Sequence, residues 1–294
     1  MRKLVQTKNN KAMKLSIKSV ALFIALLGAA DVANAQGAKF PQASSGQTII
    51  QDFGLGKITL VYARPNVKER KIFGGMEPLG VVWRNGANAA TRIKFTDAVK
   101  IEGKDLPAGE YGLFSIPDKK EWTVIFSKTP DQWGAYTYKE SDDVLRIKVK
   151  TTALKDKVET LTMQFSDVFE TAAKLNMMWE NSAYAINITT DIDEKVMANI
   201  AEAMKGEKKP YFNAALYYYQ NGKDLKQALE WVTEAEKSDM KAPWFKLWKG
   251  RIQLKMGDKT AAATTAQQGI EAAKAQNIDE YVRLNSELLA QAKK

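Results

Sequence analysis

The segment Tyr62–Gly75, with the sequence YARPNVKERKIFGG, gathers positive charge around a single proline. Proline fixes the backbone directly after Arg64, and the closing Gly74-Gly75 pair permits a sharp return of the chain. Four basic residues stand within eight positions: Arg64, Lys68, Arg70 and Lys71. The pattern predicts a loop that presents cations to a small anionic ligand.

A second turn follows in VVWRNGANAATRIKF, where Trp83, Arg84 and Asn88 come together. A guanidinium binds two oxygens of a carboxylate, sulfate or phosphate in a fork-like geometry. If the two turns meet, Arg64 and Arg84 form a clamp for such a group, with Trp83 beside it. The alternative is structural: the arginines pair with buried acids such as Glu180 and brace a crossover between sheets.

Aromatic residues offer a different ligand chemistry. The segment QWGAYTYKE places Trp133 and Tyr136 in a loop, where their rings form a stacking platform for a sugar or pack within the loop itself. Trp122 and Trp179 alternate with polar neighbours, which predicts that both lie in the core.

The chain has no histidine and no cysteine, which excludes thiol nucleophiles, imidazole bases and zinc sites with nitrogen or sulfur ligands. Paired carboxylates still permit glycoside hydrolysis, with Asp142-Asp143 and Asp105 with Glu110 as candidates. Adjacent carboxylates at a strand end point to opposite faces, so we predict no catalytic residue, metal or cofactor.

The first residues are typical of a cleaved signal peptide. Basic residues precede the apolar run Val20–Ala30, which is shorter than the roughly 20 residues that span a bilayer. A small-residue pattern then predicts cleavage between Ala35 and Gln36, whether the chain starts at Met1 or Met13. We therefore expect export to the periplasm or cell surface of a Gram-negative bacterium, without disulfides.

The formal net charge of +10 falls by five when residues 1–35 are removed, because that segment holds six Lys/Arg and one Asp. No polarised basic stretch remains of the kind that nucleic-acid binding requires. We predict neither a nucleic-acid partner nor a membrane span after cleavage.

Residues 36–191 show hydrophobic alternation with a period of two. Examples are Ile58-Leu60-Tyr62, Leu145-Ile147-Val149 and Tyr184-Ile186-Ile188. Each such run has one buried and one solvated face, and short runs separated by turn residues predict an antiparallel β-sandwich-like domain. The predicted fold class is therefore α+β, since the period changes after Asp191.

Residues 192–294 predict six helices rich in Ala, Leu, Lys, Glu and Gln. Gly222 and Gly257 lie 35 residues apart, as do Ala215 and Gly250. This spacing resembles the tetratricopeptide repeat, whose helical hairpins recur about every 34 residues. We expect a block of helical hairpins that offers a face to a protein partner or to a second copy.

Several sequence blocks resemble the family called domain of unknown function 2911. They are YARPNVKERKIFGG, VWRNGANAAT, LPAGEYGLFSIP, EWTVIFSK, QWGAY and MMWENSAYAINITTD, in that order between Phe40 and Asp191. The resemblance implies an exported, β-rich bacterial protein, often with a helical tail. It supplies no catalytic residues.

The first hypothesis is a non-enzymatic binding protein that holds a small anion or glycan. Its eight candidate ligand residues are Arg64, Lys68, Arg70, Trp83, Arg84, Asn88, Trp133 and Tyr136. The alternatives are a carboxylate-dependent hydrolase of envelope carbohydrate and a purely structural module.

Overall fold

The computed structural model describes residues 40–294, so the predicted signal peptide and its cleavage site lie outside the described residues. Antiparallel strands occupy the first part of the described chain and helices the second, which confirms the α+β fold class. Within residues 40–294 the last strand ends at Thr189 and the first α-helix begins at Asp193, next to the predicted change of period.

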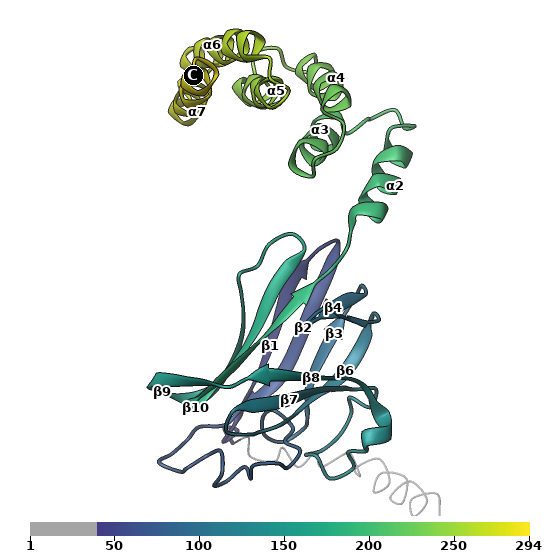
Figure 1. Cartoon of the computed structure of the whole chain (residues 1–294), viewed down its shortest axis with the longest axis vertical. Helices are drawn as coiled ribbons and strands as arrows, with labels where there is room; N and C mark the ends of the chain where they lie inside the picture. Colours follow the sequence, from purple (N-terminus) through teal and green to yellow (C-terminus); the bar gives the residue numbers. More distant parts are fainter. Residues whose placement is uncertain (1–39) are drawn as a thin grey trace, which may run out of the picture. The chain divides into compact units, whose positions relative to one another are not determined.

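The strands form two antiparallel sheets (Figure 1). One is six-stranded in the order β1-β2-β3-β6-β7-β8, and the other is four-stranded in the order β5-β4-β10-β9. The strands are β1 (Ser45–Phe53), β2 (Gly56–Arg64), β3 (Thr91–Phe95), β4 (Val99–Ile101), β5 (Lys104–Leu106), β6 (Gly109–Ile116), β7 (Glu121–Ser127), β8 (Asp143–Lys150), β9 (Thr152–Ser166) and β10 (Ala172–Thr189). A short 3₁₀ helix, η1 (Glu140–Asp142), precedes β8.

The six predicted helices are present. They are α2 (Asp193–Ala203), α3 (Tyr211–Gln220), α4 (Leu225–Glu236), α5 (Pro243–Lys255), α6 (Lys259–Ala275) and α7 (Asp279–Ala292). Consecutive helices from α3 onward pack on one another, with Ala215 and Ala228 fully buried in one helical core. The resemblance to tetratricopeptide repeats stays a prediction. Within residues 40–294, every helix is too short or too polar to cross a bilayer.

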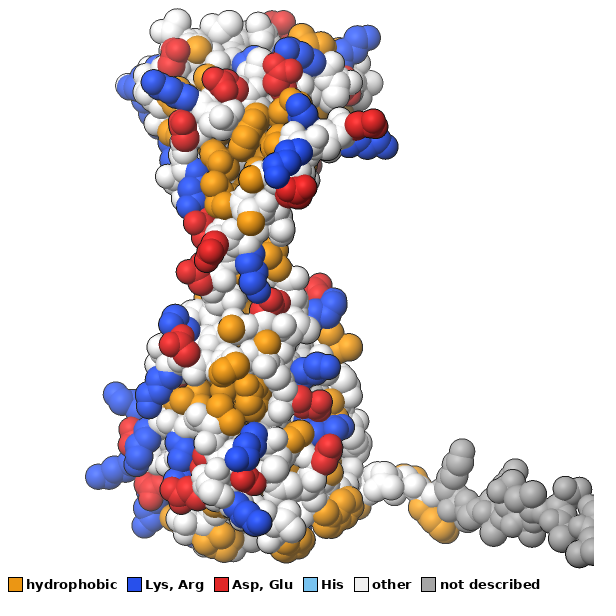
Figure 2. Space-filling view, turned by 90° about the vertical axis from the view of Figure 1, so that its right-hand side faces the viewer, with side chains coloured by type: hydrophobic (Ala, Val, Ile, Leu, Met, Phe, Trp, Pro, Cys, Tyr) orange, Lys and Arg blue, Asp and Glu red, His pale blue; other side chains and the backbone are white. Residues whose placement is uncertain are grey.

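The surface carries charges of both signs. On the face drawn in Figure 2, Lys and Arg side chains lie among Asp and Glu side chains, with hydrophobic side chains gathered in separate patches. Ion pairs between exposed side chains, such as Lys174 with Asp167 at 2.7 Å, occur on the strand region. This face therefore presents a mixed field and not a single-sign patch.

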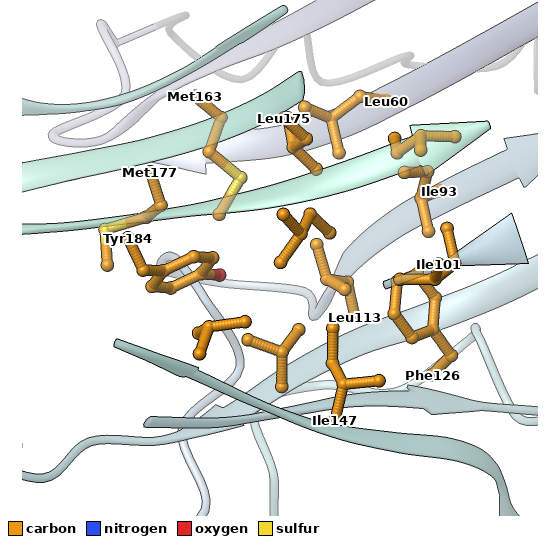
Figure 3. Packing of buried hydrophobic residues seen from close by; sticks show 14 of the residues in the cluster. Leu60, Ile93, Ile101, Leu113, Phe126, Ile147, Met163, Leu175, Met177 and Tyr184 are labelled. Carbon is orange, nitrogen blue, oxygen red and sulfur yellow. The ribbon is translucent and has the colours of Figure 1, made fainter. Parts of the chain in front are cut away.

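The core of the strand region lies between the two sheets. Side chains from the six-stranded sheet, such as Leu60 and Ile93, face Met163 of β9 and Tyr184 of β10 (Figure 3). Alternate positions of β2 are buried because successive side chains point to opposite faces. Trp122 and Trp179 are buried, as predicted.

Candidate functional site

The crossover between β2 and β3 holds most of the predicted cationic residues. At its start the backbone of β2 continues past Arg64 and pairs with β9 in the other sheet. The N–H of Leu161 donates to the Pro65 carbonyl at 2.9 Å, and the N–H of Val67 donates to the Glu159 carbonyl at 2.7 Å. Proline has no N–H to leave unpaired, so it fits a position where only its carbonyl is used.

Arg64 fastens the two sheets together at this corner. Its Nε donates to the Leu161 carbonyl at 3.0 Å, and its Nη2 donates to Thr162 Oγ1 at 3.0 Å. The guanidinium thus holds β2 to β9 through hydrogen bonds, and the buried acid of the structural alternative is not its partner. Glu180 instead accepts the backbone N–H of Ile72 at 3.3 Å.

Lys68 and Arg70 lie in a tight turn. Lys68 and Glu69 both have positive φ, at 47° and 61°, and the N–H of Arg70 donates to the Val67 carbonyl at 3.1 Å. Non-glycine residues rarely adopt this left-handed conformation, and here it reverses the chain. The Arg70 side chain folds back and donates from Nε to the Val67 carbonyl and from Nη2 to the Asn66 carbonyl. Lys68 is exposed.

Arg84 has different surroundings from Arg64. It lies near the carboxyl group of Glu77. Burial raises the pKa of this carboxyl group above its ordinary value of 4.5, although the positive charges of Arg84 and Arg70 act to lower it. The Nε of Arg84 is buried and has no hydrogen-bond partner within residues 40–294. Since Arg64 binds β9 and Arg84 faces Glu77, the structure gives the two predicted clamp arginines separate partners.

Trp83 belongs to the core. Only 2% of it is exposed, and its ring stacks on Trp179 at a centroid distance of 5.7 Å. Phe73 meets both indoles and Trp122 edge-on, at 4.6 to 5.9 Å. These contacts place Trp83 among buried rings and not beside a solvent-facing anion site.

The structure brings the other three predicted residues together. The loop between β7 and β8 lies against the end of the crossover: the N–H of Gly134 donates to the Asn88 carbonyl at 3.0 Å, and Ala89 pairs with Trp133. Trp133 is 67% exposed and Tyr136 is 84% exposed. Asn88, Trp133 and Tyr136 therefore share one surface region.

Gly134 shapes this loop. It has a φ of +70°, and a Cβ at this position would lie 2.7 Å from the Tyr136 ring. The absence of a side chain lets the ring fold back over the loop. The sequence analysis did not include Gly134 among the site residues, although a glycine between two aromatic residues of a loop indicates a tight turn.

A hollow of about 300 Å³ lies beside this region. Its lining comes from β2, from residues 87–90, from Arg92 and from residues 130–132. At its rim Arg92 pairs with Asp131 at 3.1 Å and with Glu110 at 3.5 Å. The rim thus combines the cation of Arg92 with the carboxylate of Asp131, and Glu110 pairs with Arg92 from outside the lining. Sequence reasoning did not connect Arg92 with Asp131, since they are paired only by the folded loop.

The candidate catalytic carboxylates are separately engaged. Asp143 accepts the Tyr138 hydroxyl at 2.7 Å and lies 3.1 Å from Arg146 Nε, whereas Asp142 lies 3.3 Å from Lys128 Nζ. Burial raises the pKa of Asp143, although the hydrogen bond from Tyr138 and the positive charge of Arg146 both act to lower it. Asp105 pairs with Lys100. No group of three or more acidic residues within 40–294 has metal-binding geometry.

Residues 44–188 match the family model described as "Protein of unknown function (DUF2911)". The match confirms the resemblance seen in the sequence blocks, and it runs from just before β1 to Ile188 in β10. Searches of curated proteins and of solved structures gave no match.

Proposed function

We propose that this protein is an exported, non-enzymatic binding protein whose β domain holds a glycan at the region of Asn88, Trp133 and Tyr136. The observation that carries the proposal is the exposure of two large aromatic rings, 67% for Trp133 and 84% for Tyr136, on one loop. A Trp or Tyr side chain buries about 150–250 Å² when it is covered, so leaving both uncovered forgoes substantial hydrophobic free energy. A sugar ring can cover such a surface with its apolar face.

The polar groups at the rim favour a glycan over a simple anion. Arg92 offers donors, whereas Asp131 and Glu110 offer acceptors, and all three lie within one ion-pair network. Sugar hydroxyls both donate and accept, so they match a rim of mixed sign. A phosphate or sulfate would be repelled by the carboxylates and would gain from Arg92 alone.

The loop that carries the aromatics is held in place before any ligand arrives. Gln132 Nε2 donates to Thr129 through both the carbonyl and the hydroxyl, at 2.9 and 2.8 Å, and Thr137 donates to Gln132 Oε1 at 3.1 Å. The Ala90 N–H adds a bond to the Gln132 carbonyl at 2.9 Å. Such preorganisation lowers the entropy cost of binding.

The helical region serves, in this proposal, as a face for a protein partner. It carries half-buried aromatic pairs on neighbouring helices, Tyr218 with Trp231 and Tyr219 with Trp248. Aromatic side chains and arginine are enriched at protein interfaces, and Arg251 lies 4.6 Å above the Trp248 ring. The periplasm or cell surface is the proposed location.

The test is binding of the purified protein to an array of bacterial envelope glycans and chitin oligomers, followed by titration calorimetry. The variant Trp133→Ala should lose at least about tenfold in affinity, because aromatic hot spots contribute about 2 kcal/mol or more. Its stability should change by no more than about 0.5 kcal/mol, the usual scale for exposed sites.

The matched control is Phe169→Ala, since Phe169 is 64% exposed on a different loop. Unchanged affinity in this variant assigns the effect to the Trp133 loop. Absence of binding to every glycan, or equal losses in both variants, overturns the proposal.

A further inference from the structure

A second pocket, distinct from the Trp133 region, has the chemistry of an oxyanion site. It has a volume of about 390 Å³, in the range of small-molecule sites. Four stretches of chain that are distant in the sequence line it: the crossover, the β6–β7 turn with the start of β7, the end of β8 and the middle of β10. We propose that this pocket binds a small, sugar-sized molecule that carries a carboxylate or phosphate group.

The pocket is lined by two lysines that have no ion-pair partner within the described residues. Lys71 and Lys119 both line it, and within residues 40–294 neither ammonium group forms an ion pair or a hydrogen bond. Other lysines of the strand region also lack ion pairs within that range, but Lys71 and Lys119 share one pocket. Together their ammonium groups attract an anion and present six N–H donors.

The neutral groups of the lining add to this excess of donors. The hydroxyl of Ser182 has no hydrogen-bond partner in the described part of the chain. The single acid of the lining, Asp118, already accepts the N–H of Lys120 at 3.1 Å, and its carbonyl accepts the Thr151 hydroxyl. Its charge lowers the net positive charge of the pocket but does not cancel it.

The floor of the pocket explains why the ligand should also contain a ring. Phe73 and Trp122 both line the pocket, with centroids 4.6 Å apart. An aromatic floor of this kind can pack against the apolar face of a ring.

The partly exposed ring and the donors of the lining together describe the ligand. Phe73 is only partly buried and is followed by Gly74, whose φ is +78°. The unpaired groups that line the pocket, the ammonium groups of Lys71 and Lys119 and the hydroxyl of Ser182, are all donors, which favours an oxyanion as the ligand.

The experiment titrates the purified protein with glucuronate, glucose 1-phosphate and glucose, and follows tryptophan fluorescence, for which Trp122 is the reporter. We expect saturable binding of at least one of the two anions, weakening as salt increases, and at least about tenfold weaker binding of glucose. The two anions separate a carboxylate from a phosphate as the preferred group.

Lys71→Gln and Lys119→Gln should each weaken anion binding about fivefold or more, whereas Lys120→Gln serves as the matched control. Lys120 is the next residue in the same turn, is exposed and does not line the pocket. Trp133→Ala should leave anion binding intact, so this site stands or fails independently of the glycan site. No saturation below about 10 mM, or equal losses in Lys119→Gln and Lys120→Gln, overturns the inference.

Discussion

Asn85 should be among the residues on which the stability of the β domain depends most. It has no exposed surface, and its φ is 53°. Its Nδ2 donates to the Leu113 carbonyl at 3.2 Å, and its Oδ1 accepts the Ser115 hydroxyl at 2.7 Å. Asn85 thereby fixes the end of the crossover to β6, on which the position of Asn88 depends.

The cost of Asn85→Ala follows from these contacts. The two shorter hydrogen bonds contribute about 1 kcal/mol each, and the third, from the Tyr184 hydroxyl to Oδ1 at 3.4 Å, contributes less. Leaving the Ser115 hydroxyl buried and unpaired adds about 1–3 kcal/mol. Alanine in the left-handed conformation costs a further 1 kcal/mol or so, since only glycine, asparagine and aspartate adopt it readily. We expect a loss of about 4–6 kcal/mol of unfolding free energy.

Two further variants separate these contributions. Asn85→Gly loses the same hydrogen bonds without the backbone strain, so it should be about 1 kcal/mol more stable than Asn85→Ala. Asn88 also has positive φ, at 60°, and its side chain has no hydrogen bond within the described residues. Asn88→Ala should therefore cost only the strain, about 1 kcal/mol.

The assay is equilibrium urea unfolding followed by tryptophan fluorescence, with circular dichroism in parallel to check that both probes report the same transition. A loss below about 1 kcal/mol in Asn85→Ala, or a loss no larger than that of Asn88→Ala, would refute the assignment of a buried anchoring role to Asn85.

Two other predictions concern charged groups. Arg64→Lys should lower the unfolding free energy, measured with urea, by about 1 kcal/mol, because a lysine ammonium cannot donate to both acceptors on β9 as the planar guanidinium does. Unchanged stability would contradict the role of Arg64 in bracing the two sheets. Burial of Glu236 raises its pKa, but the hydrogen bonds from Lys246 and Lys249 lower it by more than burial raises it. The pKa in the folded protein therefore lies below the ordinary 4.5. The stability that this carboxylate provides should be present above pH 4.5 and be lost as the pH falls through the folded pKa. Glu236→Gln should therefore be about 3 kcal/mol less stable than wild type at neutral pH and approach wild type in acid. A stability difference that stays constant across this pH range would contradict the prediction.

Much of the fold could be predicted because each element's signal is local. Alternation at Ile58, Leu60 and Tyr62 marks the buried face of β2 whatever its partners are. The helical periods after Asp191 are likewise contained within single segments, and glycines such as Gly257 separate them. The buried faces of β2 and β8 and the six helices followed from these patterns.

The candidate sites could be predicted only in part, because their geometry depends on contacts between distant residues. The acceptors that hold Arg64 lie 97 and 98 positions away on β9, and nothing near Arg64 identifies them. The same limit applies to Lys119, which shares a pocket with Lys71.

The sequence by itself determined the fold class, the order of strands and helices, and the absence of thiol and imidazole chemistry, since these depend on composition and on local periodicity. Only the tertiary structure decided which residues meet. It gave Arg64 and Arg84 different partners, buried Trp83 and joined Asn88 to the Trp133 loop. The physical reason is that a side chain's partners are set by sheet pairing and loop packing across long sequence separations, which no short segment encodes.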